Sequence, residues 1–170
     1  MTEIRIARPD DPAARPLLDG LADEYARTYG EKTNGELAVR QVVDFVPPRG
    51  VFLLALDGAT TVAGGAVAPL TGDAAEVKRM WTSPLHRRRG LARRVLAALE
   101  QEALKLDYRR LWLQTGALSA PALALYRASG YERIAPFGRY RDEPLAVAFE
   151  KRLRAGALGA DATSFAHVKP

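Results

Sequence analysis

Apolar residues recur along this chain at two spacings, one typical of strands and one typical of helices. Alternation and short apolar runs predict strands over residues 3–7, 51–56, 61–69, 75–82, 111–115, 131–135 and 145–149. Spacings of three and four predict three helices. One starts after the Pro and Asp residues of 8–12 and ends at Gly30, one covers residues 91–106 and is amphipathic, and one covers residues 120–129. A shorter helix is expected around 37–45.

The connections between these elements predict the fold class. The strand–helix–strand unit over 75–115 requires a right-handed crossover, so its two strands should be parallel. Short turns at 57–58 and 71–73 predict antiparallel neighbours. We therefore expect a single α/β domain with a mixed, mostly antiparallel sheet of six to seven strands and helices on both faces. Gly64 and Gly65 within one strand predict a bulge or a close backbone approach.

We place the domain at residues 1–152 and a Gly- and Ala-rich C-terminal tail at 153–170. Such a tail is expected to pack through Phe165 and Val168 on its own domain or on a second subunit, which would make a homodimer. The chain has no cysteine, which excludes disulfides, thiolate zinc sites and a Cys nucleophile. No His, Asp or Glu cluster has metal-ligand spacing, and no metal is expected. No apolar run resembles a signal peptide or a membrane span, so we expect a cytoplasmic protein without a membrane partner.

Positive charge is concentrated at one place in the chain. The formal net charge is +5, and five arginines fall within residues 87–94. A compact cluster of this kind favours one anionic ligand. A nucleic-acid-binding protein is the alternative that overall basicity would allow, but no recognition helix or aromatic platform accompanies the cluster, so no nucleic-acid partner is expected.

The arginine cluster lies between the strand ending at Thr82 and the helix starting near Leu91. A helix N-terminus offers unpaired N–H groups and the positive end of the helix dipole, which together favour anions. Gly90 has no side chain to keep a phosphate from the backbone, and Ala92 is nearly as small. Guanidinium groups can add charge-assisted hydrogen bonds. The segment predicts a diphosphate site. It contains neither the Gly-Lys-Ser/Thr of a P-loop nor a second glycine of a dinucleotide fingerprint.

The motif Arg87-x-x-Gly90-x-Ala92 resembles the signature Arg/Gln-x-x-Gly-x-Gly/Ala of the GNAT N-acetyltransferase family. Residues 76–84 look like that family's fourth strand, and residues 123–131 look like its later helix with the Gly-Tyr turn. Residues 136–144 resemble a segment of many small bacterial members. By element order the similarity covers residues 2–152, and it is most specific over 76–144. Many members have Asn where this chain has Ser119.

The resemblance implies a GNAT fold with a central splay of the sheet and an acetyl-CoA cosubstrate. Backbone groups of Met80 and Thr82, with Trp81 between them, would pair with the pantetheine arm, and Ser119 would make a further cofactor contact. The diphosphate would lie on the loop and the first helical turn, formed by Arg87, Arg88, Arg89, Gly90, Leu91, Ala92 and Arg93.

Two residues are candidates for proton transfer. Strand alternation places Glu76, Lys78, Met80 and Thr82 on one face, which brings Glu76 near the expected thioester. Glu76 is either the proton acceptor, a role that the resemblance supports, or an ion-pair partner of Lys78 or Arg79. The resemblance gives Tyr126 the role of general acid at the CoA sulfur, and the alternative is a packed helix tyrosine.

The expected function is transfer of an acetyl group from acetyl-CoA to a primary amine of a small molecule, by direct attack in a ternary complex. The alternative is a non-catalytic domain that binds or senses acyl-CoA, which would need the loop but not Glu76 and Tyr126. Tyr25, Tyr29 and Trp81 are candidates for an acceptor pocket, although aromatic residues at helical spacing, such as the two tyrosines, are more often core. The sequence alone does not choose the amine.

Overall fold

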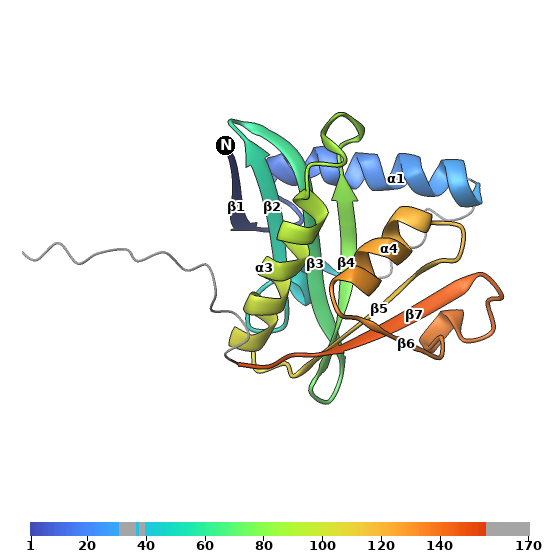
Figure 1. Cartoon of the computed structure of the whole chain (residues 1–170). Helices are drawn as coiled ribbons and strands as arrows, with labels where there is room; N and C mark the ends of the chain where they lie inside the picture. The colour runs from blue at the N-terminus through green and yellow to red at the C-terminus, as the bar shows by residue number, and fades with distance from the viewer. Residues whose placement is uncertain (31–36, 38–39, 156–170) are drawn as a thin grey trace, which may run out of the picture.

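The computed structural model describes residues 1–30, 37 and 40–155. Seven strands form one open sheet, with helices on both faces (Figure 1). The elements are β1 (Thr2–Ala7), η1 (Pro12–Ala14), α1 (Arg15–Tyr29), η3 (Val42–Phe45), β2 (Val51–Asp57), β3 (Thr60–Thr71), β4 (Ala74–Thr82), η4 (Pro84–His86), α3 (Leu91–Lys105), β5 (Arg110–Gly116), α4 (Ala120–Ala128), β6 (Glu132–Ile134), η5 (Gly138–Tyr140) and β7 (Ala146–Arg152). The predicted mixed α/β fold with seven strands is confirmed.

The strands follow the order β1-β2-β3-β4-β5-β7-β6 across the sheet. Only β4 and β5 are parallel, as the crossover through α3 requires, and every other neighbouring pair is antiparallel. The expected helix around 37–45 is a 3-10 turn over Val42–Phe45 in its described C-terminal part. Leu37 is also helical, and residues 38 and 39 lie outside the described residues.

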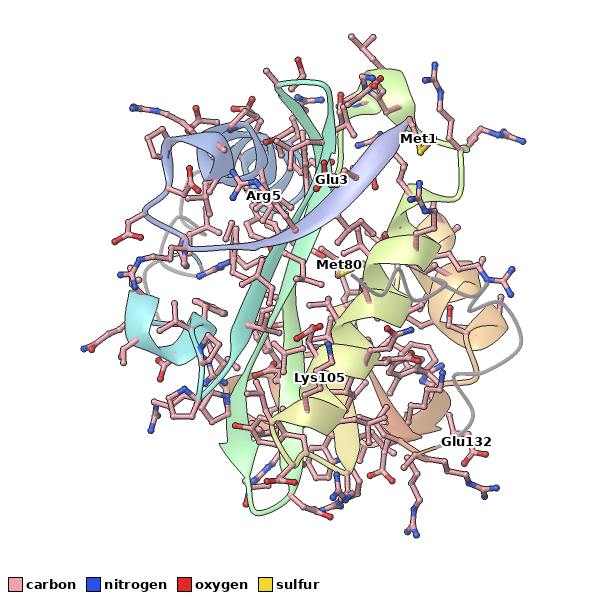
Figure 2. All side chains as sticks on the ribbon, turned by 90° about the vertical axis from the view of Figure 1, so that its left-hand side faces the viewer. Met1, Glu3, Arg5, Met80, Lys105 and Glu132 are labelled. Atoms are coloured by element: carbon pink, nitrogen blue, oxygen red, sulfur yellow. The ribbon has the colours of Figure 1, made fainter. Side chains whose placement is uncertain are left out.

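Two apolar layers enclose the sheet. On one face α3 packs its buried stripe on the central strands, and on the other face α1 covers the same strands (Figures 1 and 2). We call these the α3 side and the α1 side. The α3 side includes Val77, Leu96, Leu99, Leu111 and Phe149, and the α1 side includes Leu17, Leu21, Phe45, Phe52 and Trp81.

The glycine pair of β3 allows both layers to approach the strand closely. A Cβ on Gly64 would lie 2.4 Å from Cδ1 of Leu17, and one on Gly65 would lie 2.5 Å from the sulfur of Met80. The β3–β4 register also shifts between Gly64 and Ala66. The close backbone approach predicted for this pair is therefore confirmed, whereas the extra residue at this register shift lies in β4, opposite the pair. Figure 2 shows Met80 between the sheet and α3.

The C-terminal strand leads directly into the core. Leu153, the first residue of the predicted tail, is buried with the α3-side cluster, and its N–H donates to the Arg109 carbonyl at 2.9 Å. Residues 156–170, including the proposed anchors Phe165 and Val168, lie outside the described residues. Within the described residues no helix has the length and apolar character needed to cross a membrane, and no cluster of three or more His, Asp and Glu side chains could hold a metal ion.

Candidate active site

The sheet opens between its two parallel strands. Pairing of β4 with β5 covers only Ala74–Arg110, Ala75–Leu111 and Glu76–Trp112, whereas β4 continues to Thr82 and β5 to Gly116. On its other side β4 stays paired with β3 up to Thr82 opposite Ala63. The edge of residues 77–82 that faces β5 therefore has no strand partner within the described part of the chain. An extended chain could add to this edge by backbone hydrogen bonds.

A bulge in β4 changes which side chains share a face. Arg79 has a φ of 61°, and Lys78 pairs opposite Ala66 while Trp81 pairs opposite Gly64, so the β4 strand holds one extra residue. Glu76 and Lys78 lie on the α1 side, but Met80 packs on the α3 side. The predicted common face for Glu76, Lys78, Met80 and Thr82 is wrong, because an inserted residue shifts strand alternation by one position.

The loop after β4 leads into an uncovered helix N-terminus. Gly90 is the N-cap of α3 with a φ of 72°, a conformation that favours glycine. No side chain caps the helix, and its first turn contains no acidic residue. A Cβ on Gly90 would meet no atom within 4 Å, so the space beside the N-cap of α3 is open. These features fit a bound diphosphate.

The arginines of this loop differ in their present contacts. Arg87 donates from Nη2 to Oε1 of Glu24 in α1 at 2.6 Å, and Arg94 donates to the Thr2 carbonyl at 3.0 Å. Arg88, Arg89 and Arg93 are exposed beside the helix N-terminus. Burial raises the pKa of Glu24 even though Arg87 lowers it. The Glu24–Arg87 pair joins α1 to the loop, and nothing in the sequence pattern indicated it.

Glu76 is buried on the α1 side within an ion-pair network. Its Oε2 accepts from Nη2 of Arg40 at 2.8 Å, and its Oε1 lies 3.4 Å from Nζ of Lys78. Arg40 also donates to the Pro69 carbonyl at 2.7 Å. The neighbouring Arg79 donates to the Leu37 carbonyl and lies over the Phe45 ring. The predicted ion pair with Lys78 is present, whereas Arg40, 36 residues earlier, was not predicted.

Tyr126 lies on α4 at the opposite face of the sheet. Its ring packs against Tyr131 and Phe149, with centroid distances of 5.8 and 5.9 Å. Burial raises the pKa of the Tyr126 hydroxyl far above its usual range, and an interaction with Tyr25 of α1 adds to the rise. The hydroxyl is therefore protonated at neutral pH, and the raised pKa also makes it a weaker acid than an exposed tyrosine.

The other predicted positions surround the opening. Ser119 is the N-cap residue of α4, directly beyond β5, and its N–H donates to the Gly116 carbonyl at 3.0 Å. The hydroxyl of Tyr29 fills the space above Gly116, where a Cβ would collide with it. Trp81 has its backbone on the unpaired β4 edge, but its indole is in the α1-side core against Gly20. Tyr25 and Tyr29 thus approach the opening from α1.

Comparison with known proteins places this architecture among acyltransferases. The model of the acetyltransferase (GNAT) family matches residues 15–131. An "IAA acetyltransferase" of Azospirillum brasilense is 35% identical over 156 residues, which cover 90% of this chain and 100% of the relative.

Two solved structures share the fold at low sequence identity. A GNAT-family acetyltransferase from Staphylococcus aureus superimposes with a TM-score of 0.73 at 14% identity, covering 89% of this chain and 100% of that one. The PaiA N-acetyltransferase of Thermoplasma acidophilum, solved in complex with coenzyme A, gives a TM-score of 0.69 at 16% identity, covering 89% and 99%.

Proposed function

The chain belongs to the GNAT acetyltransferase family and is an acyl-CoA-dependent N-acyltransferase, and we propose that it transfers an acetyl group from acetyl-CoA to a primary amine of a small molecule by direct attack in a ternary complex. The observation that carries the proposal is the continuity of two features. The unpaired edge of β4 ends at Thr82, and the open N-terminus of α3 begins eight residues later, after Gly90.

Each of these two features would bind a different part of acetyl-CoA. The N–H groups of the first α3 turn, with the exposed Arg88, Arg89 and Arg93, would hold the diphosphate. Backbone groups of Met80 and Thr82 would bind the pantetheine arm along the β4 edge. Ser119 faces the same opening from α4. An arm that runs from the loop toward Glu76 would place the thioester carbonyl where β4 and β5 separate.

Proton transfer is assigned to two residues on opposite faces of the sheet. The attacking amine must lose a proton, and the leaving thiolate must gain one. Glu76 would accept the amine proton from the α1 side, directly or through water, while Arg40 and Lys78 fix the position of its carboxylate. Tyr126 would donate to the thiolate from the α3 side, since its hydroxyl carries a proton at neutral pH.

The acceptor approaches from the α1 side, where Tyr25 and Tyr29 lie beside the opening. Thiol release from acetyl-CoA with a panel of small primary amines, amino acids and short peptides tests the proposal. Saturable release with a small amine, and an acetylated product identified by mass spectrometry, is the expected result. Release with peptides alone would replace the small-molecule assignment, and thiol release without acetylated amine would overturn amine transfer.

We also propose that the tail of residues 153–170 packs on its own domain or on a second subunit of a homodimer. A chain truncated after Arg154 is then expected to melt at a lower temperature or to lose the dimer in analytical ultracentrifugation. An unchanged sedimentation coefficient and melting temperature would contradict this role for the tail.

A further inference from the structure

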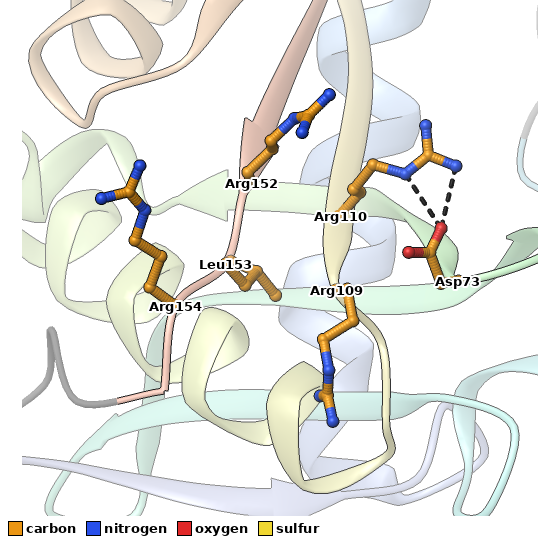
Figure 3. Close-up of a pocket in the computed structure, with 6 residues that line it drawn as sticks. All are labelled: Asp73, Arg109, Arg110, Arg152, Leu153 and Arg154. Carbon is orange, nitrogen blue, oxygen red and sulfur yellow. Dashed lines mark hydrogen bonds and ion pairs between the residues drawn. The ribbon is translucent and has the colours of Figure 1, made fainter.

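A cavity lies at the opposite end of the sheet from the anion loop (Figure 3). It has a volume of about 440 Å³ and is lined by Asp73, Arg109, Arg110, Arg152, Leu153 and Arg154. Because Asp73 precedes β4 and the anion loop follows β4, the length of this strand separates the cavity from the anion loop by roughly 25 Å. The cavity is therefore not part of the proposed acetyl-CoA site.

Backbone pairing holds the arginines of this cavity together. The N–H groups of Arg109 and Arg110 donate to the Asp73 carbonyl at 2.8 and 3.2 Å. Arg110 pairs opposite Arg152 in the β5–β7 ladder, and Leu153 donates to the Arg109 carbonyl. Two chain segments that are distant in sequence, 109–110 and 152–154, thus bring four guanidinium groups to one edge. Figure 3 shows these groups spread around Leu153 rather than directed at a single point.

The carboxylates nearby neutralise only part of this charge. Asp73 accepts from Nε and Nη2 of Arg110 at 2.9 and 2.8 Å, so this carboxylate is already paired. Arg109 lies 3.6 Å from Asp107 and Arg152 lies 3.7 Å from Glu150, and both arginines are more than half exposed. Within the described residues Arg154 has no carboxylate partner. Exposed pairs at such distances contribute little and yield readily to a stronger anion.

We propose that this cavity binds a linear oligophosphate, either inorganic tripolyphosphate or the triphosphate group of a nucleotide. Guanidinium groups match phosphate oxygens with paired hydrogen bonds, and spread arginines suit an anion with several charges in a row better than a single compact phosphate. The volume falls within the roughly 300–1,000 Å³ of small-molecule sites.

The lining also separates this ligand from other polyanions. Among the described residues no aromatic side chain lines the cavity, so these residues offer no surface on which the bases of a single-stranded nucleic acid could stack. Leu153 is 9% exposed and gives an acidic peptide almost no apolar contact. Charge contacts alone remain, which favours the ligand with the highest charge density.

Amide chemical shifts test the site directly. Titration of the isotope-labelled full chain with tripolyphosphate is expected to shift the resonances of Arg109, Arg110, Arg152 and Leu153, and the shifts should saturate. Arg152→Ala with Arg154→Ala should weaken binding at these resonances at least tenfold. Arg109→Ala provides a second variant that leaves Arg152 and Arg154 intact and should also weaken binding. Titrations with ATP and AMP test whether a nucleotide can supply the oligophosphate. ATP, which carries a triphosphate group, is expected to bind, and AMP, which carries a single phosphate, is not.

Two variants with the same loss of charge serve as controls. Arg88→Ala with Arg89→Ala removes two exposed arginines from the anion loop, and Arg15→Ala with Arg133→Ala removes two from elsewhere on the surface. Both should leave the affinity at Arg109 and Arg152 within about twofold. Equal weakening in all three variants, shifts confined to the residue 87–93 loop, tighter binding of an oligoglutamate peptide, or absence of saturation would each overturn the proposal. None of these outcomes depends on acetyl transfer.

Discussion

Arg40 donates a hydrogen bond of 2.8 Å from its guanidinium Nη2 to Oε2 of Glu76, a carboxylate that is buried on the α1 side of the sheet. The donor lies in the segment after α1, and the acceptor lies at the last pair of β4 with β5. The contact therefore ties that segment to the residue beside which the sheet opens. Loss of either partner has consequences for both stability and catalysis.

Arg40→Met is expected to lower the free energy of unfolding by about 1–3 kcal/mol, because it leaves a buried carboxylate with fewer donors. In the double variant Arg40→Met with Glu76→Gln the loss should be smaller than the sum of the two single losses. Denaturant unfolding of the four proteins measures this coupling. Strict additivity would show that the two side chains do not interact in solution.

Glu76→Gln alone should lower kcat, and a near-normal pH–rate profile would contradict its role as proton acceptor.

Gly90→Asp is expected to reduce CoA affinity at least tenfold while the fold is retained. The substitution places a carboxylate in the open space before the α3 N-terminus, where it would repel a phosphate. Since Gly90 has a φ of 72°, Gly90→Ala reports the backbone strain alone and should cost less affinity. Calorimetric titration of the folded variants with CoA measures the difference. Equal affinity in Gly90→Asp and wild type would remove the diphosphate from this loop.

Tyr126→Phe is expected to lower kcat by roughly ten- to a thousandfold, because the ring packing survives and only the proton donor is lost. The KM for acetyl-CoA should change little. Because the pKa of Tyr126 is raised by burial, its deprotonation should not reduce the wild-type rate below pH 10. Tyr108→Phe is the matched control, since it removes a hydroxyl that donates to the Arg49 carbonyl away from the opening. Similar kcat values for both variants would contradict acid catalysis.

Gly20→Ala is expected to destabilise the protein, although alanine normally strengthens a helix by about 0.5–1 kcal/mol relative to glycine. A Cβ on Gly20 would lie 2.2 Å from Nε1 of Trp81, so the indole or α1 must move. We expect a loss of about 1–3 kcal/mol, with a change in tryptophan fluorescence. Trp81→Phe should relieve much of the effect in the double variant. A gain in stability from Gly20→Ala would show that α1 shifts without cost.

The Glu24 carboxyl predicts a pH dependence of stability. Burial raises its pKa above the ordinary 4.5, so the folded protein binds this proton more tightly than the unfolded chain does. Its contribution to stability is therefore present at low pH and declines as pH rises through the folded pKa. The difference in unfolding free energy between wild type and Glu24→Gln should fall as pH rises from 4 to 7. A rising difference would mean that the ion pair with Arg87 outweighs burial.

The sequence by itself determined the elements and the anion loop. The periodic apolar positions of 91–106 predicted α3 to within one residue, because a helix face is encoded in spacing alone. The pattern Arg87-x-x-Gly90-x-Ala92 predicted an open helix N-terminus, which depends only on residues next to one another in the chain. The single parallel pair followed from the crossover rule, which depends on the order of elements.

Only the tertiary structure decided which side chains meet. The bulge at Arg79 is a property of the pairing of β4 with β3, so alternation along β4 placed Met80 on the wrong face. Arg40 reaches Glu76 across 36 residues, and Arg87 reaches Glu24 across 63, because two elements happen to fold against each other there. The four arginines around Leu153 come from segments about forty residues apart. Contacts of this kind depend on strand register and helix docking, which the spacing of residues within one element does not contain.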